Sequence, residues 1–364
     1  MKKLFLATLI LAVTLTRLTA ADAHALLVYT DKVSGQDDIM PVWITAASAL
    51  NIEYKTTPQG LNRTRMSRAS INSIYFFEPP IFKEATELYE SRDYQGAREK
   101  YALCRAAFKA VDDLPGNYGT LAGYYELESC RKLFDLEALK DLLDAYQFGS
   151  LVREHHRNQL EVYQVWDAVR TKSWPRLDSL ATKMLAEKKW ISEHLAQLKY
   201  CHGLALEGLG RPTDALIAFN GAFTADYTAS EAITKQAALA CLRIIKDHDE
   251  VKLAIALWGT EDEDVNSSGY YLLQEGVALC DLWKKALGGG QALPAEHAVF
   301  LKYRETNKPK PKPKKKADDK KDAPKAKKDD DAKKPSDKEP ADKEPADKEP
   351  ADKKPADKKD EKKN

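Results

Sequence analysis

The sequence predicts a mainly α-helical protein in which about five helical hairpins stack as a solenoid, preceded by a small β-rich module and followed by a charged tail. Paired segments with helical apolar spacing recur roughly every 35–45 residues between 79 and 290, the interval typical of helical-repeat arrays. Residues 24–78 carry short β-branched and aromatic runs instead, and residues 308–364 carry neither residue class. These contrasts divide the chain into its predicted domains.

The N-terminal residues 1–23 are typical of a secretory signal peptide. Lys2 and Lys3 precede an apolar stretch, and Ala21-Asp22-Ala23 fits a cleavage site, with Thr19-Ala20-Ala21 as the alternative. The apolar stretch is shorter than the ~20 residues that a membrane span requires. We therefore expect export, with no membrane span after the signal is cleaved.

The module at 24–78 is predicted to be a β-meander, open or closed as a small barrel. Its strands are expected at residues 25–30, 42–46, 50–55, 62–66 and 70–77. About fifty residues bury little core on their own, so the module should pack against the helical domain. Phe76, Phe77, Pro79 and Pro80 are the predicted junction.

Helical periodicity begins after Pro80 and continues to the glycines at 288–290. The paired segments are 81–90 with 94–111, 118–134 with 136–146, 152–172 with 175–188, a hairpin at 199–227, and 229–246 with 250–258. A last helix is expected at 269–287, and residues 291–307 are predicted to be a linker. The alternative is an irregular helical bundle whose hairpins pack in unrelated ways.

Two hairpins share one pattern of small and large residues, which lets antiparallel helices approach closely. In the later hairpin the pattern consists of Gly203, Leu206, Ala215, Phe219 and Ala222, with Gly210 in the turn. In the earlier one it consists of Ala85, Leu88, Ala97, Tyr101 and Cys104.

On these residues the helical domain at 79–290 resembles the tetratricopeptide-repeat superfamily. The resemblance is good for 82–108 and 196–225, whereas the other three hairpins depart from it in loop length and small-residue placement. It implies an α-solenoid that mediates protein–protein contacts without catalytic residues of its own. The whole chain looks like an exported bacterial repeat protein, which implies a place in the periplasm or cell envelope.

The sequence contains no motif that predicts catalysis, a cofactor or a metal centre. No phosphate-binding loop, G-x-S-x-G or H-E-x-x-H is present. His155 and His156 are expected on a solvated, charged helix face. The acidic run 261–264 lacks the Ca²⁺-loop spacing and is expected to be hydrated. We predict that the protein is not an enzyme.

The five cysteines lie among helical alanines and leucines, and their odd number leaves at least one thiol unpaired within a monomer. They are Cys104, Cys130, Cys201, Cys241 and Cys280. Packing in helix interfaces is the favoured interpretation. A bridge between Cys104 and Cys130 is the alternative.

Protein or peptide segments are the predicted partners. The candidate contact residues are the aromatic side chains of Tyr124, Tyr125, Tyr163, Trp166, Trp174 and Trp190. Their alternative role is to fill the space between helices. With a net charge of +1, the chain has no bulk basic field that would favour nucleic acid. The predicted function is a non-catalytic exported scaffold or adaptor.

The tail at 308–364 contains 22 Lys against 16 Asp and Glu, with Pro at regular intervals. Such a composition cannot bury enough apolar area to fold, so we expect it to be disordered. Its favoured role is a spacer. In the alternative function, the chain is an envelope structural protein whose tail associates with wall polymer or a membrane surface.

Overall fold

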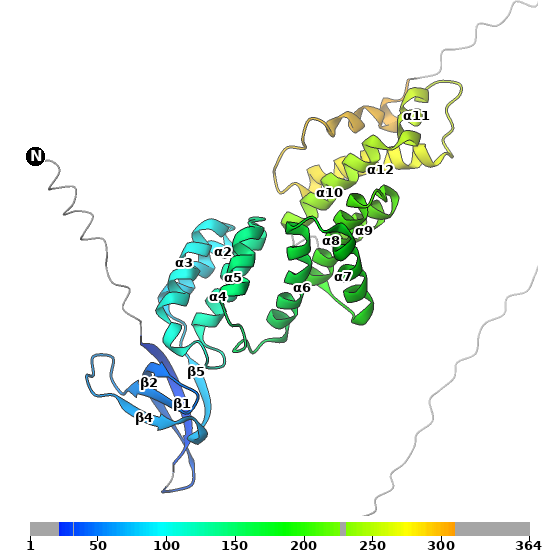
Figure 1. Ribbon diagram of the computed structural model, residues 1–364. Coiled ribbons are helices and arrows are strands. Elements are labelled where there is room, and N and C mark those ends of the chain that lie inside the picture. Colours follow the sequence, from blue (N-terminus) through cyan, green and yellow to red (C-terminus); the bar gives the residue numbers. More distant parts are fainter. Residues whose placement is uncertain (1–21, 32, 226–230, 310–364) are drawn as a thin grey trace, which may run out of the picture. The chain divides into compact units, whose positions relative to one another are not determined.

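The computed structural model describes residues 22–31, 33–225 and 231–309 (Figure 1). The predicted signal peptide up to Ala21 and the tail from Lys310 lie outside the described residues. The predicted architecture is confirmed at the level of a mainly helical chain preceded by a small antiparallel sheet.

The sheet has five strands, close to the five runs predicted from the sequence. They are β1 (Ala23–Thr30), β2 (Asp37–Ala47), β3 (Asn51–Lys55), β4 (Thr64–Ser67) and β5 (Ile71–Phe76). All pairs are antiparallel, in the order β4-β3-β2-β1-β5. A simple meander would place β5 beside β4. Instead, the 3-10 turn Arg68–Ser70 leads the chain across to β1, so that β4 and β5 are the edge strands.

Alternation of buried and partly exposed residues explains why the sheet packs on one face. In β1, Ala25 and Leu27 are fully buried, and Val42 lies opposite Ala25 in β2. This face forms one hydrophobic core with α2, α3 and the start of α4. Phe82 and Ala85 of α2 are buried in this core. The module therefore does pack against the helices, as its small size predicts.

The described residues contain eleven α-helices, whose bounds follow the predicted pairs within a few residues, except that α8 begins at Ser192 and not at the expected residue 199. They are α2 (Pro80–Glu90), α3 (Tyr94–Ala107), α4 (Tyr118–Lys132), α5 (Leu136–Ala145), α6 (Glu154–Arg170), α7 (Trp174–Glu187), α8 (Ser192–Gly208), α9 (Pro212–Ala225), α10 (Glu231–Asp247), α11 (Asp249–Leu257) and α12 (Ser268–Leu282). Their starts are set locally. Pro80 opens α2, and Asp93, Asn117 and Asp135 accept hydrogen bonds from backbone N–H groups in the first turns of α3, α4 and α5.

Small residues let α8 and α9 pack closely. A Cβ on Gly203 would lie 2.6 Å from the ring of Phe219, and both residues are buried. Ala215 and Ala222 are also fully buried, and Gly210 has a φ of +73° in the turn, where glycine is favoured. In α2 and α3 the corresponding residues Ala85, Ala97, Tyr101 and Cys104 are fully buried, while Leu88 is half-buried.

Residues 291–307 differ from the predicted linker. They contain the 3-10 segments Ala298–Tyr303 and Glu305–Asn307, and Phe300 is fully buried. Its ring packs over Gly276 of α12, where an added Cβ would come within 3.0 Å. This segment therefore completes the helical core. Among the described residues, no helix combines the length and the apolar character that crossing a bilayer requires.

Candidate functional site

The connection between the sheet and the helices shapes a cavity. β5 ends at Phe76, and the backbone N–H of Phe77 donates to the carbonyl of His24 at 2.9 Å, which fixes the chain as it leaves the sheet. Pro79 and Pro80 then restrict the backbone and start α2. The first cavity, of about 610 Å³, lies at this turn.

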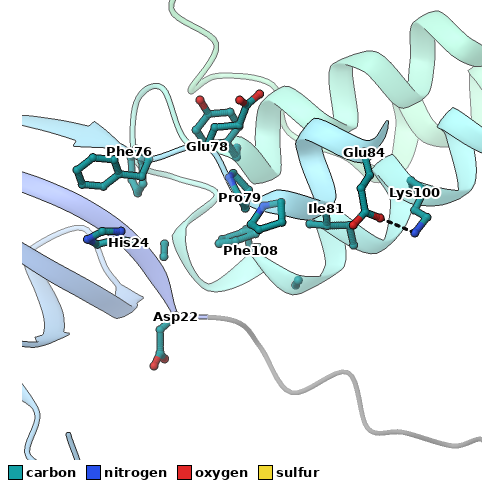
Figure 2. A pocket seen from close by; sticks show the side chains of 14 residues that line it. Asp22, His24, Phe76, Glu78, Pro79, Ile81, Glu84, Lys100 and Phe108 are labelled. Carbon is teal, nitrogen blue, oxygen red and sulfur yellow. Dashed lines mark hydrogen bonds and ion pairs between the residues drawn. The ribbon is translucent and has the colours of Figure 1, made fainter. Parts of the chain in front are cut away.

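Figure 2 shows how the two parts of the molecule line this cavity. His24 and Phe76 lie on the side of the sheet, while Ile81 and Phe108 lie on the side of the helices. The ion pair between Glu84 and Lys100, 2.7 Å apart, lies at the helical end. A mostly apolar lining with few polar groups, at this volume, is typical of ligand-binding cavities.

An aromatic stack forms the wall on the sheet side. The His24 ring lies between Trp43, with centroids 4.6 Å apart, and Phe77, with centroids 4.2 Å apart. Phe77 nevertheless remains 46% exposed. The stack fixes the orientation of an aromatic ring that a ligand can still reach.

Two further cavities continue along β5. A cavity of about 220 Å³ shares Phe76 and Tyr118 with the first. A third, of about 450 Å³, shares Gly116 and Val152 with the second and is also lined by Ile71 and Ile74 of β5. We call the three cavities together the junction groove.

Buried hydrogen bonds hold the helical wall of the groove in place. The Asn117 side chain, 1% exposed, caps α4 and donates to the carbonyl of Leu114 at 2.7 Å. The Ser150 hydroxyl donates to the carbonyl of Asp112 at 2.6 Å, which ties the loop before α6 to the loop before α4. The wall is therefore formed before any ligand binds.

The middle cavity has a polar end at the start of α6. Arg153 is exposed there, and no side chain caps the first turn of the helix. His156 was expected on a solvated helix face, but it is 1% exposed, and its Nε2 has no hydrogen-bond partner among the described residues. Burial, then His155 and Arg153, lower the pKa of His156 to about 4, so the ring is neutral near pH 7. The start of α6 has no side-chain cap and carries Arg153, next to Glu154 of the first turn. A helix start without a cap and a neighbouring positive charge both favour an anionic group.

A buried charged network joins α4, α6 and α8, and no motif in the sequence predicted it. Arg131 is 2% exposed and bonds to Glu128 at 2.6 Å and to Glu193 at 2.5 Å. The Tyr163 hydroxyl donates to Glu128 from α6. Glu128 and Arg131, spaced i to i+3 inside a helix, were the only available signal, and such pairs usually lie on exposed surfaces.

The network satisfies its own charges. Burial alone would raise the pKa of the Glu128 carboxyl, but Arg131 overcomes this effect and holds the pKa well below its usual range. Beside it, the Gln159 and Gln197 amides bond to each other at 2.9 and 2.7 Å, and Trp166 donates to Gln197 at 2.8 Å. Fully paired polar groups of this kind indicate a role in positioning helices.

The aromatic residues predicted to contact partners lie mostly inside the helical domain. Tyr163 and Trp166 are 1% exposed, and Tyr124 and Trp190 are 6% exposed. Burial favours the alternative role of filling space for these four. Tyr125 and Trp174 are partly exposed, and for them a partner contact stays a prediction.

All five cysteines are buried free thiols, including Cys104 and Cys130. Burial raises the pKa of the Cys104 thiol to about 12 and that of Cys130 to about 11, which makes both poor nucleophiles. In residues 22–31, 33–225 and 231–309, no cluster of three or more His, Cys, Asp or Glu could hold a metal ion. The acidic run 261–264 was expected to be hydrated, but for Glu263 this is wrong: its side chain is 8% exposed and pairs with Lys308 at 2.9 Å.

Comparison of the chain with family models, with curated protein sequences and with solved structures found no match.

Proposed function

We propose that this protein is a non-catalytic scaffold that binds an extended segment of another protein in the junction groove. The single observation that carries the proposal is the succession of three adjoining cavities along β5, an edge strand of the sheet. Edge strands present unpaired backbone groups, and an extended peptide can pair with them while its side chains enter neighbouring pockets.

The lining supports a segment with apolar anchors and an acidic group. Phe77, Ile81 and Phe108 suit an apolar side chain in the first cavity. At the middle cavity, Arg153 and the start of α6 suit a carboxylate. The segment we propose is therefore extended, with one bulky apolar residue and one acidic residue or C-terminal carboxylate.

We also propose that the helices form a tetratricopeptide-like array that presents this groove. The close approach of α8 and α9 at Gly203 supports the proposal, as does the burial of the matching residues in α2 and α3. Contacts between alternate helices, such as α6 with α8 and α8 with α10, are also typical of repeat arrays.

Export to the periplasm or cell envelope is part of the same proposal, and the sheet suggests where the signal would be cleaved. Ala23 is 2% exposed and pairs with Ile44, and Asp22 forms an ion pair with Lys55. Cleavage after Ala23 would remove both contacts, whereas cleavage after Ala21 keeps them. Mass spectrometry of the exported protein should find Asp22 as the first residue; a chain that begins at His24 would contradict this cleavage site.

A peptide display library tests binding without requiring that the partner be identified first. We expect the full chain to select sequences that share an apolar and an acidic position. The Arg153→Glu variant should bind the selected peptides at least tenfold more weakly. The matched control is Arg157→Glu, which makes the same charge change at an exposed residue one turn along α6.

The control variant should bind the peptides as the unchanged protein does, and both variants should show the same thermal unfolding. Equal loss of binding in the two variants would assign the effect to general electrostatics and contradict the proposed site. Failure to select any shared sequence would contradict the proposed function itself.

A further inference from the structure

A second site lies far along the chain, where the tail begins. The Lys308 ammonium is 2.9 Å from Glu263 Oε2 and lies over two aromatic rings, 5.1 Å from the centroid of Trp258 and 5.3 Å from that of Tyr270. The two rings are themselves stacked, with centroids 5.7 Å apart and planes 18° apart. A carboxylate and two aromatic faces around one ammonium group form an aromatic cage.

The carboxylate of this cage is shielded from water, unlike that of a surface ion pair. The Glu263 side chain is only 8% exposed, and Tyr270 is 7% exposed. Exposed Lys–Glu pairs contribute little because water screens them, but a shielded carboxylate needs a cationic partner. Glu263 Oε1 is buried and has no hydrogen-bond partner among the described residues, so the carboxylate can accept a second donor.

The site also contacts the residue that follows the lysine. Gly259 has a φ of +71°, and a Cβ added there would lie 2.8 Å from Cδ of Pro309. Only glycine fits both this backbone conformation and the proline ring. The contacts therefore extend over two consecutive residues, a lysine and a proline.

We infer that Trp258, Gly259, Glu263 and Tyr270 form a binding site for a Lys-Pro dipeptide, occupied in this structure by Lys308-Pro309. The sequence repeats the same dipeptide at 310–311 and 312–313, and again at 334–335 and 354–355. A cavity of about 300 Å³, lined by Glu263, Tyr270 and Glu250 among others, adjoins the site and leaves room for flanking ligand atoms. The ligand class is a Lys-Pro segment of a peptide, and the chain's own Lys308-Pro309 is its resident occupant.

The intramolecular occupant should compete with an added peptide. A short tether gives an effective concentration in the millimolar range, so a free Lys-Pro peptide should bind weakly while Lys308 occupies the cage. A full-length variant with Lys308→Gln, Lys310→Gln and Lys312→Gln lacks the lysines of the first three Lys-Pro dipeptides, and the protein is not truncated. This variant should bind the added peptide more tightly than the unchanged chain.

The experiment titrates both full-length proteins with the acetylated hexapeptide Lys-Pro-Lys-Pro-Lys-Pro and follows tryptophan fluorescence. We expect at least tenfold tighter binding to the triple variant, and at least tenfold weaker binding when the peptide carries Gln in place of Lys. Adding Glu263→Gln to the triple variant should weaken binding of the Lys peptide at least tenfold. The matched control adds Lys302→Gln, which changes an exposed lysine nearby and should leave the affinity as it was.

Equal affinity for the Lys and Gln peptides would overturn the inference, as would a Glu263→Gln variant that binds normally. If Glu263→Gln unfolds, Gly259→Ala provides a second test of the proline contact. That variant should expose the backbone amide of Lys308, which donates to Glu305 at 3.1 Å, to faster hydrogen exchange. Unchanged exchange at Lys308 would also overturn the inference.

Discussion

The close pairing of α8 with α9 and the junction of α4, α6 and α8 hold neighbouring helices together by opposite means. The contact between α8 and α9 is apolar. It depends on Gly203, which has no side chain and so allows the Phe219 ring to pack against the helix backbone. At the other junction, Arg131 is buried among charged partners. The first depends on residue size, and the second depends on complete pairing of buried charges.

This difference teaches which contacts tolerate change. A substitution at a size-based contact lowers the free energy of unfolding according to the steric misfit, and the neighbouring residues can adjust in part. A buried charged network fails abruptly when one partner is removed, because an uncompensated charge remains in a medium of low dielectric constant. We therefore expect the charged junction to be the more sensitive of the two, and the following substitutions test that order.

The largest expected effect comes from Arg131→Met. The substitution leaves Glu128 and Glu193 without their shared partner and should lower the free energy of unfolding by about 3–5 kcal/mol. Urea unfolding followed by circular dichroism measures the change. Arg176→Met, which removes a half-exposed arginine from α7, is the control and should change stability by less than about 1 kcal/mol. Similar values for the two variants would show that the network does not hold the junction.

A second effect appears only in acid. His156 of α6 packs on Tyr124 of α4, with ring centroids 4.2 Å apart, and its folded-state pKa of about 4 lies below the ~6.5 of an unfolded chain. The unfolded chain therefore binds a proton first, and stability should fall as the pH decreases from 6.5 to 4. At pH 5 this single group accounts for at most about 2 kcal/mol.

His155, Arg153 and Glu128 are the charged or titratable groups that act on His156, with burial as the largest cause of its shift. The His156→Gln variant should flatten the pH dependence in this window, measured as unfolding free energy at pH 7, 6, 5 and 4. Below about pH 4.5 the unchanged protein and the variant should both lose stability, because the folded-state pKa of Glu128 lies below its unfolded value and the unfolded chain binds the proton first. An unchanged slope between pH 6.5 and 4 in the variant would contradict a buried neutral ring.

The smallest effect is expected at the apolar pairing of α8 and α9. Gly203→Ala adds a Cβ 2.6 Å from the Phe219 ring, which should cost about 1–3 kcal/mol, offset by about 1 kcal/mol of helix propensity. The control, Gly221→Ala in α9, meets only the flexible Lys199 side chain at 3.3 Å and should be neutral or stabilising. Thermal unfolding distinguishes the pair. A Gly203→Ala protein as stable as the control would show that α8 and α9 are not closely packed.

Local patterns were enough to predict most of the helices and strands. Apolar spacing, Pro80 and the capping residues Asp93 and Asn117 act within one or two turns of the chain, so most helix bounds could be read directly. The start of α8 was missed, because no side chain caps that helix. The position of β5 beside β1 could not, because strand order depends on how the sheet meets the helices. For the same reason Phe300 was missed as a core residue, since its neighbour Gly276 is distant in sequence.

The candidate site was predicted only in part. Phe76, Phe77, Pro79 and Pro80 were expected at the junction of the sheet and the helices, and they line the first cavity there. The contributions of Arg153 and His156 depend on a loop that brings the start of α6 to the end of β5, and no local pattern encodes that meeting. The aromatic residues were predicted to contact partners because they are numerous in one stretch of the sequence. Their number does not show which face of a helix is buried.

Site-specific photo-crosslinking tests the central proposal, that the junction groove binds a protein segment, most directly. A p-benzoylphenylalanine replaces Phe77 in the groove or, as the control, Tyr271 of α12, which is 62% exposed. After irradiation in the native cells, mass spectrometry identifies the crosslinked peptides. We predict that position 77 yields a small set of extended segments with an apolar and an acidic residue, and that position 271 does not. Crosslinks that are absent at position 77, or the same at both positions, would contradict the proposal.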